Sequence, residues 1–196
     1  INHDSLTTFQ GNFRYIPSAF VNVALGEEAS MDGEAAADIR VSGTFRHNER
    51  PVTESTVKPY RAWLRYAAPR FEIRAGLQKI SFGSASLFRP LMWFDAIDPR
   101  DPLQLTRGVY ALLGRYYPAT TTNFWVWGVY GQDETRGWEA IPSRKGSPEF
   151  GGRFQIPFFP GEAALTYHHR TAELRLPDHL GAGQQTVSFA EDRIGL

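Results

Sequence analysis

The chain contains no cysteine, and this absence excludes disulfide bonds, thiolate nucleophiles and cysteine-ligated metals. It also has no net charge, because 21 Lys and Arg residues balance 21 Asp and Glu residues. Nothing in the charge therefore indicates a nucleic acid or an anionic membrane surface as a partner. Long hydrophobic runs are missing as well: no stretch of about 18 apolar residues occurs, which excludes a transmembrane helix but not transmembrane strands.

What is abundant is aromatic side chains, which make up 14% of the 196 residues. The mean hydropathy is nevertheless only -0.36, as in a water-soluble protein. This combination suits a barrel with an apolar outside and a wet inside. The composition does not shift along the chain, so residues 1–196 are predicted to be a single β-barrel domain or the N-terminal portion of one.

The most informative pattern is strict alternation over residues 60–78, interrupted by the turn Ala67-Ala68-Pro69. Before the turn, Leu64 and its alternate neighbours are apolar while Arg61 and Arg65 share the opposite face. After the turn, apolar residues again alternate with charged ones. A period of two over this length predicts a β-hairpin with one apolar and one polar face.

Similar alternation predicts about nine strand segments, followed by one that is cut short. They cover residues 6–15, 19–25, 38–46, the two arms of 60–78, 109–117, 123–132, 150–156, 162–170 and a shortened strand at 191–196. Trp125 and Trp127 share the second face of their segment, which is thus apolar on both sides. The expected loops are 26–34, 47–59, 81–106, 133–148 and 173–189, and short turns are expected at 118–122 and 157–161.

From Tyr60 onward, short and long connections alternate, so all the short ones lie at one end of the sheet. Transmembrane barrels show this asymmetry, with strands of about 9 to 11 residues. Large aromatic residues gather near strand ends, as in an interfacial belt: Tyr60, Tyr66, Phe71, Tyr116, Tyr117, Phe124, Phe158, Phe159 and Tyr167. We predict an all-β, antiparallel, up-and-down transmembrane β-barrel. A soluble sandwich or jelly roll is the alternative, since its strands also alternate.

Residues 77–117 read LQKISFGSASLFRPLMWFDAIDPRDPLQLTRGVYALLGRYY. A strand ending in Gln, a Phe-Gly step, a loop with an IDPRDP core and a returning Gly-Val strand resemble outer-membrane porin-like β-barrel proteins of Gram-negative bacteria. Such barrels commonly end in a strand with a terminal aromatic residue, whereas this sequence ends at Gly195-Leu196. Single-chain bacterial barrels also have even strand numbers. Both departures predict that the sequence is part of a longer barrel.

The polar faces carry many arginines, and the candidate pore-lining residues are Arg40, Arg61, Arg65, Arg70, Glu72, Arg74, Arg115, Arg153, Glu162 and Arg170. In one interpretation they line a pore that favours anionic solutes. In the other they form a ladder of cross-strand ion pairs that fills a narrow barrel. The sequence leaves both open.

The insertion at 81–106 is too long for a simple hairpin loop, and its apolar and charged content suits a segment folded into the barrel as a constriction. The candidate constriction residues are Arg89, Trp93, Asp95, Asp98, Arg100 and Asp101. The three aspartates are spaced by three, but the run lacks the alternating oxygen ligands and the glycine turn of a calcium loop. We predict no metal site, and the Asp-Pro steps are explained as turn formers.

His168 and His169 are neighbours on a strand, so they point to opposite faces and cannot chelate one metal. They are expected at the lipid edge or near a loop. Residues 83–87 lack the second glycine of a nucleophile elbow, and no Walker loop or zinc helix is present. We therefore predict no enzyme and no cofactor. A hydrolase whose Ser and His come from distant strands is the alternative that a sequence leaves open.

Three functions are consistent with these sequence patterns. The first is a porin-like channel for small solutes in the outer membrane of a Gram-negative bacterium, in contact with outer-membrane lipid and with no role for nucleic acid. The second is a structural or docking barrel with other outer-membrane subunits as partners. The third is a soluble carbohydrate-binding sandwich that uses Trp93, Trp125, Trp127 or Trp138 as stacking platforms.

Overall fold

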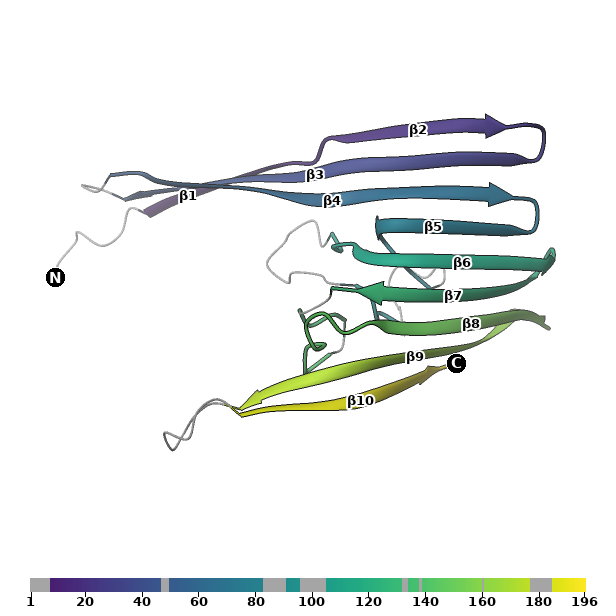
Figure 1. The fold of residues 1–196 in the computed structure, drawn as a ribbon. Coiled ribbons are helices and arrows are strands. Elements are labelled where there is room, and N and C mark those ends of the chain that lie inside the picture. The colour runs from purple at the N-terminus through teal and green to yellow at the C-terminus, as the bar shows by residue number, and fades with distance from the viewer. Residues whose placement is uncertain are drawn as a thin grey trace.

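A computed structural model of the chain describes residues 8–46, 50–82, 91–95, 105–131, 134–137, 139–159, 161–176 and 185–196. Its strands form one antiparallel sheet (Figure 1). The strands are β1 (Thr8–Tyr15), β2 (Ser18–Leu25), β3 (Ala29–Arg46), β4 (Val52–Ala68), β5 (Phe71–Gln78), β6 (Val109–Ala119), β7 (Thr122–Tyr130), β8 (Glu149–Phe158), β9 (Gly161–Leu176) and β10 (Gln185–Gly195). The described residues contain no helix, and hence none that could cross a membrane.

Consecutive strands are neighbours throughout the sheet, apart from its first edge. There β1 pairs with the second half of β3 and β2 pairs with the first half, so the two form successive parts of one edge. Within the described residues, β10 pairs only with β9, and the sheet does not close into a barrel. The predicted all-β, up-and-down, antiparallel architecture is therefore confirmed, whereas closure and membrane insertion remain proposals.

Short turns and long connections lie at opposite ends of the sheet, as predicted (Figure 1). The connections at the turn end span residues 26–28, 69–70, 120–121 and 159–160. Those at the loop end span 47–51, 79–108, 131–148 and 177–184. This arrangement follows from the up-and-down order, because every second connection returns to the same end.

Three predicted loops are wrong, because strands occupy part of each. β3 begins at Ala29, inside the predicted loop 26–34. The small and acidic residues there resemble a loop in sequence, yet Asp32 and Glu34 find partners on β4, namely Arg65 and Trp63. Cross-strand pairing thus outweighs the low strand propensity of these residues.

The predicted connection 47–59 is largely strand, because β4 begins at Val52 and pairs with β3 from Thr44 onward. Pro59 lies where the register shifts, between the pairs Ala36–Arg61 and Ala37–Pro59, and such an irregularity accommodates a residue without an N–H donor. The predicted loop 173–189 is also mostly strand, since β9 continues to Leu176 and β10 starts at Gln185.

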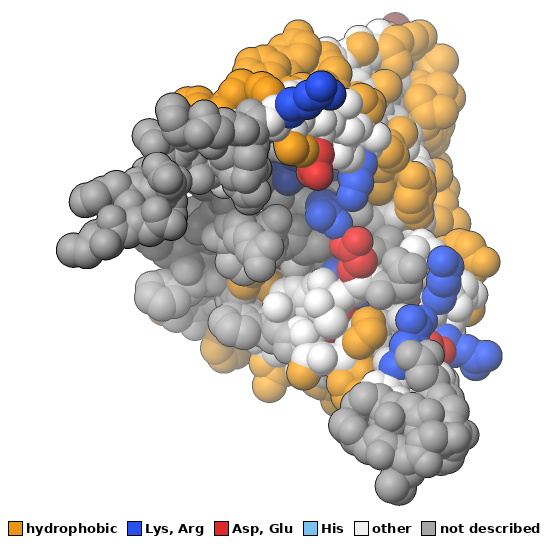
Figure 2. Space-filling view, turned by 90° about the vertical axis from the view of Figure 1, so that its left-hand side faces the viewer, with side chains coloured by type: hydrophobic (Ala, Val, Ile, Leu, Met, Phe, Trp, Pro, Cys, Tyr) orange, Lys and Arg blue, Asp and Glu red, His pale blue; other side chains and the backbone are white. Residues whose placement is uncertain are grey.

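The two faces of the sheet differ in chemistry. We call the face that carries Arg65, Arg74 and Arg115 the polar face, and the opposite face the apolar face. On the apolar face, large side chains are exposed, including Leu112 at 57% and Val126 at 63%. Figure 2 shows hydrophobic side chains along the upper and right-hand outline of the molecule and charged side chains inside it. One face of the sheet is therefore charged and partly covered, whereas the opposite face is apolar and exposed.

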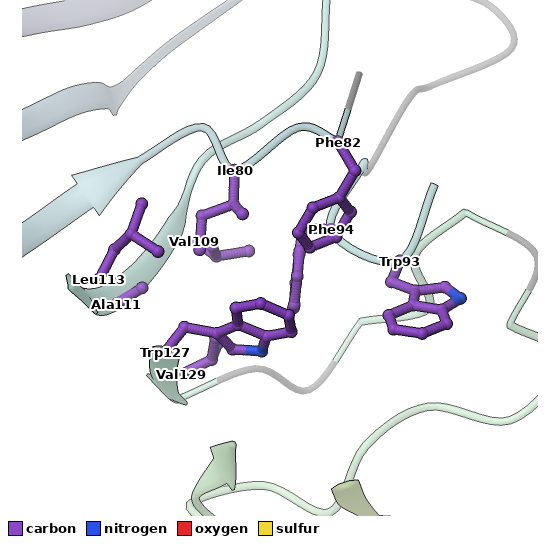
Figure 3. Packing of buried hydrophobic residues seen from close by; sticks show 9 residues of the cluster. All are labelled: Ile80, Phe82, Trp93, Phe94, Val109, Ala111, Leu113, Trp127 and Val129. Atoms are coloured by element: carbon purple, nitrogen blue, oxygen red, sulfur yellow. The ribbon is translucent and has the colours of Figure 1, made fainter. Parts of the chain in front are cut away.

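A small hydrophobic core lies on the polar face near the loop end of β6 and β7. It consists of Ile80, Phe82, Trp93, Phe94, Val109, Ala111, Leu113, Trp127 and Val129 (Figure 3). Four of these residues come from the connection 79–108, which thus folds back over the sheet. Gly195 makes room for it: a Cβ there would lie 2.4 Å from a methyl carbon of Leu91. The connection therefore reaches across the polar face as far as β10.

Candidate functional site

The polar face near the turn end carries a chain of ion pairs across four strands. Arg65 on β4 pairs with Asp32 on β3 at 2.9 Å and with Glu72 on β5 at 3.3 Å. Glu72 also pairs with Arg115 on β6 at 2.7 Å. The register explains these contacts, because Asp32 lies opposite Arg65 and Glu72 lies opposite Arg115. Each carboxylate here is shared or fully engaged.

Three arginines of the polar face form no ion pair with a carboxylate of the described residues: Arg61, Arg74 and Arg153. Arg61 donates to the carbonyl oxygens of Tyr60 at 2.6 Å and Thr106 at 3.1 Å. Arg153 donates to the hydroxyl of Thr166 at 2.9 Å. Arg74 differs from both, because its guanidinium only stacks on the ring of Trp63, 4.7 Å from the centroid.

At the loop end, Asp38 on β3 bridges two arginines. Its carboxylate accepts from Arg14 at 2.7 Å and from Arg40 at 2.9 Å, and these two arginines lie opposite each other in the β1–β3 register. Asp38 and Arg40 also line a pocket of 370 Å³ together with Lys58, Arg107 and Glu134. Arg107 and Glu134 form an ion pair of their own, so the pocket holds more cationic than anionic groups.

Beside the hydrophobic core lies a buried polar network that joins the connection 131–148 to β8 and β9. Arg136 donates to both oxygens of Glu149, at 2.9 and 2.7 Å, and each side chain is only 1% exposed. The ring of His168, fully buried, accepts a hydrogen bond at Nδ1 from Trp127 Nε1 at 3.2 Å. Since Nδ1 accepts, Nε2 carries the proton, which it donates to Glu149 at 3.1 Å.

The network extends to β10 through two further arginines. Arg170 pairs with Glu191 at 2.6 Å and with Glu139 at 3.3 Å, and Arg193 pairs with Glu139 at 3.0 Å. Ser143 accepts hydrogen bonds from both Arg136 and Arg170 at 3.2 Å. The connection 131–148 is therefore fixed to the polar face by ion pairs to the buried carboxylates of Glu139 and Glu149, and such pairs hold a segment in one position.

The connections 79–108 and 131–148 also hold each other. The backbone N–H of Gly137 donates to the carbonyl of Asp95 at 2.6 Å. A Cβ at Gly137 would lie 2.0 Å from the carbonyl oxygen of Met92, and its φ of +50° favours glycine. Phe94 contacts Arg136 through a cation–π interaction at 5.8 Å. Together the two segments cover the loop-end half of the polar face over β6 to β9.

The structure places most of the predicted pore-lining residues on the polar face. Arg40, Arg61, Arg65, Glu72, Arg74, Arg115, Arg153 and Arg170 all lie there, and Arg61, Glu72 and Arg170 are buried. Glu162 also lies on the polar face, exposed at the start of β9, where it accepts a hydrogen bond from Gln155. Arg70 instead lies exposed in the two-residue turn between β4 and β5. These two residues belong to the turn end rather than to the middle of the face.

Of the predicted constriction residues, Trp93 and Asp95 are described, and both are buried against the polar face at 8% and 3% exposure. The other four lie outside the described residues: Arg89, Asp98, Arg100 and Asp101. Within the described residues, no group of three or more His, Asp or Glu side chains is arranged to hold a metal ion.

His168 was expected at the lipid edge or near a loop, and its ring does lie 5.1 Å from that of Phe94 in the connection 79–108, but it is fully buried. It lies in the buried network, while His169 faces the other side and contacts Asp192 at 2.8 Å. Both ring nitrogens of His168 are engaged by Trp127 and Glu149, so neither is free to activate a serine. Sequence reasoning also missed Arg136 and Glu149. Their only signal in the sequence is a charged side chain close to the segment 123–132, which is apolar on both faces.

Trp93 and Trp127 are 8% and 4% exposed in the hydrophobic core, and Trp125 is partly buried beneath Arg115 at 3.8 Å. None of the three presents an open ring face of the kind that sugar stacking requires. Trp138 lies outside the described residues. Comparison of the chain with models of protein families, with curated proteins and with solved structures gives no match in any of the three.

Proposed function

We propose that this chain forms all or part of an outer-membrane β-barrel through which small solutes pass. In this proposal the apolar face contacts lipid, the polar face lines a water-filled lumen, and the connection 79–108 narrows it. The observation that carries the proposal is the inverted distribution of polarity. Charged groups such as Arg65 and Glu72 are gathered and paired on one face, while Leu112 and Val126 are exposed on the other.

The arrangement of aromatic residues on the apolar face supports the same proposal. Phe71, Tyr116, Phe124 and Phe154 lie opposite one another in register across β5 to β8, near the turn end. Tyr110 and Tyr130 form a second pair near the loop end. On β6 the two levels are separated by about 20 Å of strand. An apolar band between two aromatic girdles, about 25 Å tall, is typical of transmembrane barrels.

On β5 to β7 the residues between the two aromatic levels are aliphatic or glycine, for example Ile73, Gly114 and Val126 in one row, whereas β8 and β9 place Phe150 and Tyr167 there. A packed protein core fills space with large side chains, whereas lipid chains adapt to small ones. The row is therefore better matched to lipid than to the facing sheet of a sandwich. Without lipid or a facing sheet, the exposed aromatic rows would be in contact with water.

A second candidate, the structural or docking barrel, is favoured by the covered half of the polar face. There the hydrophobic core and the buried network of Arg136, Glu149 and His168 leave side chains in contact with each other rather than with solvent. If the covering is complete in the whole protein, the barrel conducts no solute and serves as a scaffold. Conductance separates the two candidates.

The first test is fractionation of the full-length protein, followed by electrophoresis with and without boiling. We expect the protein in the outer-membrane fraction, with a mobility that changes on heating because a closed barrel resists detergent unfolding. Solubility without detergent would contradict the membrane proposal. Planar-bilayer recordings then test the lumen: discrete conductance steps support a channel, whereas a heat-modifiable barrel without conductance supports the scaffold.

A further inference from the structure

Arg74 on β5 stands out on the polar face because its guanidinium, unlike those of Arg61 and Arg153, has neither a carboxylate nor a protein oxygen as a hydrogen-bond acceptor among the described residues. Its direct neighbours in register are Arg65 on β4 and Leu113 on β6. Like charges directly opposite each other across two strands are unfavourable, and a structural ladder would place a carboxylate there. The two nearby carboxylates, Asp32 and Glu72, are already engaged by Arg65 and Arg115.

The guanidinium of Arg74 is held in place by stacking instead of by a salt bridge. It lies over the ring of Trp63, and Trp63 is itself fixed by the hydrogen bond from its Nε1 to Glu34 at 2.9 Å. Arg115 stacks on Trp125 in the same way, at 3.8 Å. Stacking occupies one face of each guanidinium and leaves its edges, which carry the N–H donors, available for an acceptor.

Unsatisfied donors lie at this point of the structure. The Nε atoms of Arg74 and Arg115 are both buried and lack a hydrogen-bond partner. Buried polar atoms of native proteins almost always have one, from protein, water or a bound ion. Arg136 also has unpartnered nitrogens, Nε and Nη1, but its Nη2 is bound by Glu149. The other two arginines without a carboxylate, Arg61 and Arg153, donate to protein oxygens, so Arg74 differs from all of these in having no protein acceptor for its guanidinium.

We propose that Arg74, with Arg115 beside it, binds a small oxyanion, such as a carboxylate or phosphate group, on the polar face. A planar guanidinium matches the two oxygens of such a group with two parallel hydrogen bonds. The bound anion would also compensate the repulsion between Arg74 and Arg65. This assignment rests on the proposed function in one respect. If the polar face lines a lumen, the solute that the lumen attracts is an anion.

The test uses the full-length protein in detergent micelles and the fluorescence of tryptophan, since Trp63 and Trp125 stack on the two arginines. Sodium phosphate and sodium acetate are titrated separately, each against sodium chloride at equal ionic strength. We expect a saturable fluorescence change with at least one of the two oxyanions, and the pair of titrations distinguishes phosphate from carboxylate. A response that follows ionic strength alone refutes the site.

The decisive variant is Arg74→Gln, and the matched control is Arg70→Gln. Arg70 lies exposed in the turn next to the same strand, so its loss removes an equal charge away from the polar face. We expect R74Q to weaken oxyanion binding about 10- to 100-fold and R70Q to leave it unchanged. Equal binding by the wild type and R74Q overturns the assignment.

Heat-modifiable mobility shows whether R74Q is folded. If it is not, Arg74→Lys replaces it, and undiminished oxyanion binding by R74K overturns the assignment, because an ammonium cannot donate two parallel bonds. Bilayer recordings separate this inference from the proposed function. Conductance without oxyanion binding refutes the site alone, whereas oxyanion binding that depends on Arg74 without conductance refutes the channel alone.

Discussion

Replacement of Phe94 by alanine should detach the connection 79–108 from the polar face while leaving the sheet intact. Phe94 is 3% exposed, and its ring lies 5.7 Å from those of Phe82 and Trp127 and 5.1 Å from that of His168. Removing a buried phenylalanine side chain costs about 3–5 kcal/mol. Because the contacts with Trp127 and His168 join the connection to the sheet, and none of them joins strand to strand, the lost free energy favours local opening of the connection.

A local cost of that size raises the population of the detached state roughly 100- to 4,000-fold. Hydrogen exchange measures it at the amide of Gly137, which donates to the carbonyl of Asp95 and so joins the two connections. We expect this amide to exchange faster in F94A by the stated factor, with the amides of β6 and β7 unchanged. The control is Phe159→Ala, because that side chain is 95% exposed in the turn before β9. Equal acceleration in the strands, or none at all, would refute the local anchor.

Three further predictions concern the sheet. Val126→Arg should cost about 2–4 kcal/mol if the apolar face meets lipid, but under about 0.5 kcal/mol if it meets water, and urea unfolding of the reconstituted protein distinguishes the two. Gly151→Ala places a Cβ 2.3 Å from the carbonyl oxygen of Tyr167 and 2.7 Å from the ring of Trp127, so we expect about 1–3 kcal/mol of destabilisation in the same assay. Trp127→Phe leaves Nδ1 of His168 without its donor, and the loss of this hydrogen bond should cost about 1–3 kcal/mol, read as a lower temperature for the heat-induced mobility shift.

Much of the sheet was predictable because its two faces have different chemistry. The alternation over residues 60–78 predicts which face Arg65 and Leu64 occupy, and the structure confirms it. Trp125 and Trp127 also share the face opposite Phe124 and Val126, as predicted, and this is the polar face of the sheet. The pattern succeeds wherever each residue contacts the environment of its own face, since a period of two is then the only signal required.

The pattern failed where partners from distant segments decide the structure. Asp32 and Glu34 look like loop residues until Arg65 and Trp63 are placed opposite them. The position of His168 depends on Arg136 and Glu149, and the connection that brings Arg136 there has no periodicity of its own. Burial of paired charges is a property of three-dimensional proximity, and no spacing within one strand encodes it.

The direction of the strands at the two edges of the sheet limits how the sheet could close into a barrel. β1 and β2 run from the loop end to the turn end, and β10 runs the same way (Figure 1). Placed side by side, these edges would pair in parallel, unlike every other pair in the sheet. A second copy of the chain in the same membrane orientation would offer edge strands of that same direction, so pairing with it would also be parallel. An all-antiparallel ring therefore requires an odd number of additional strands between the edges, and the first of them must run opposite to β10.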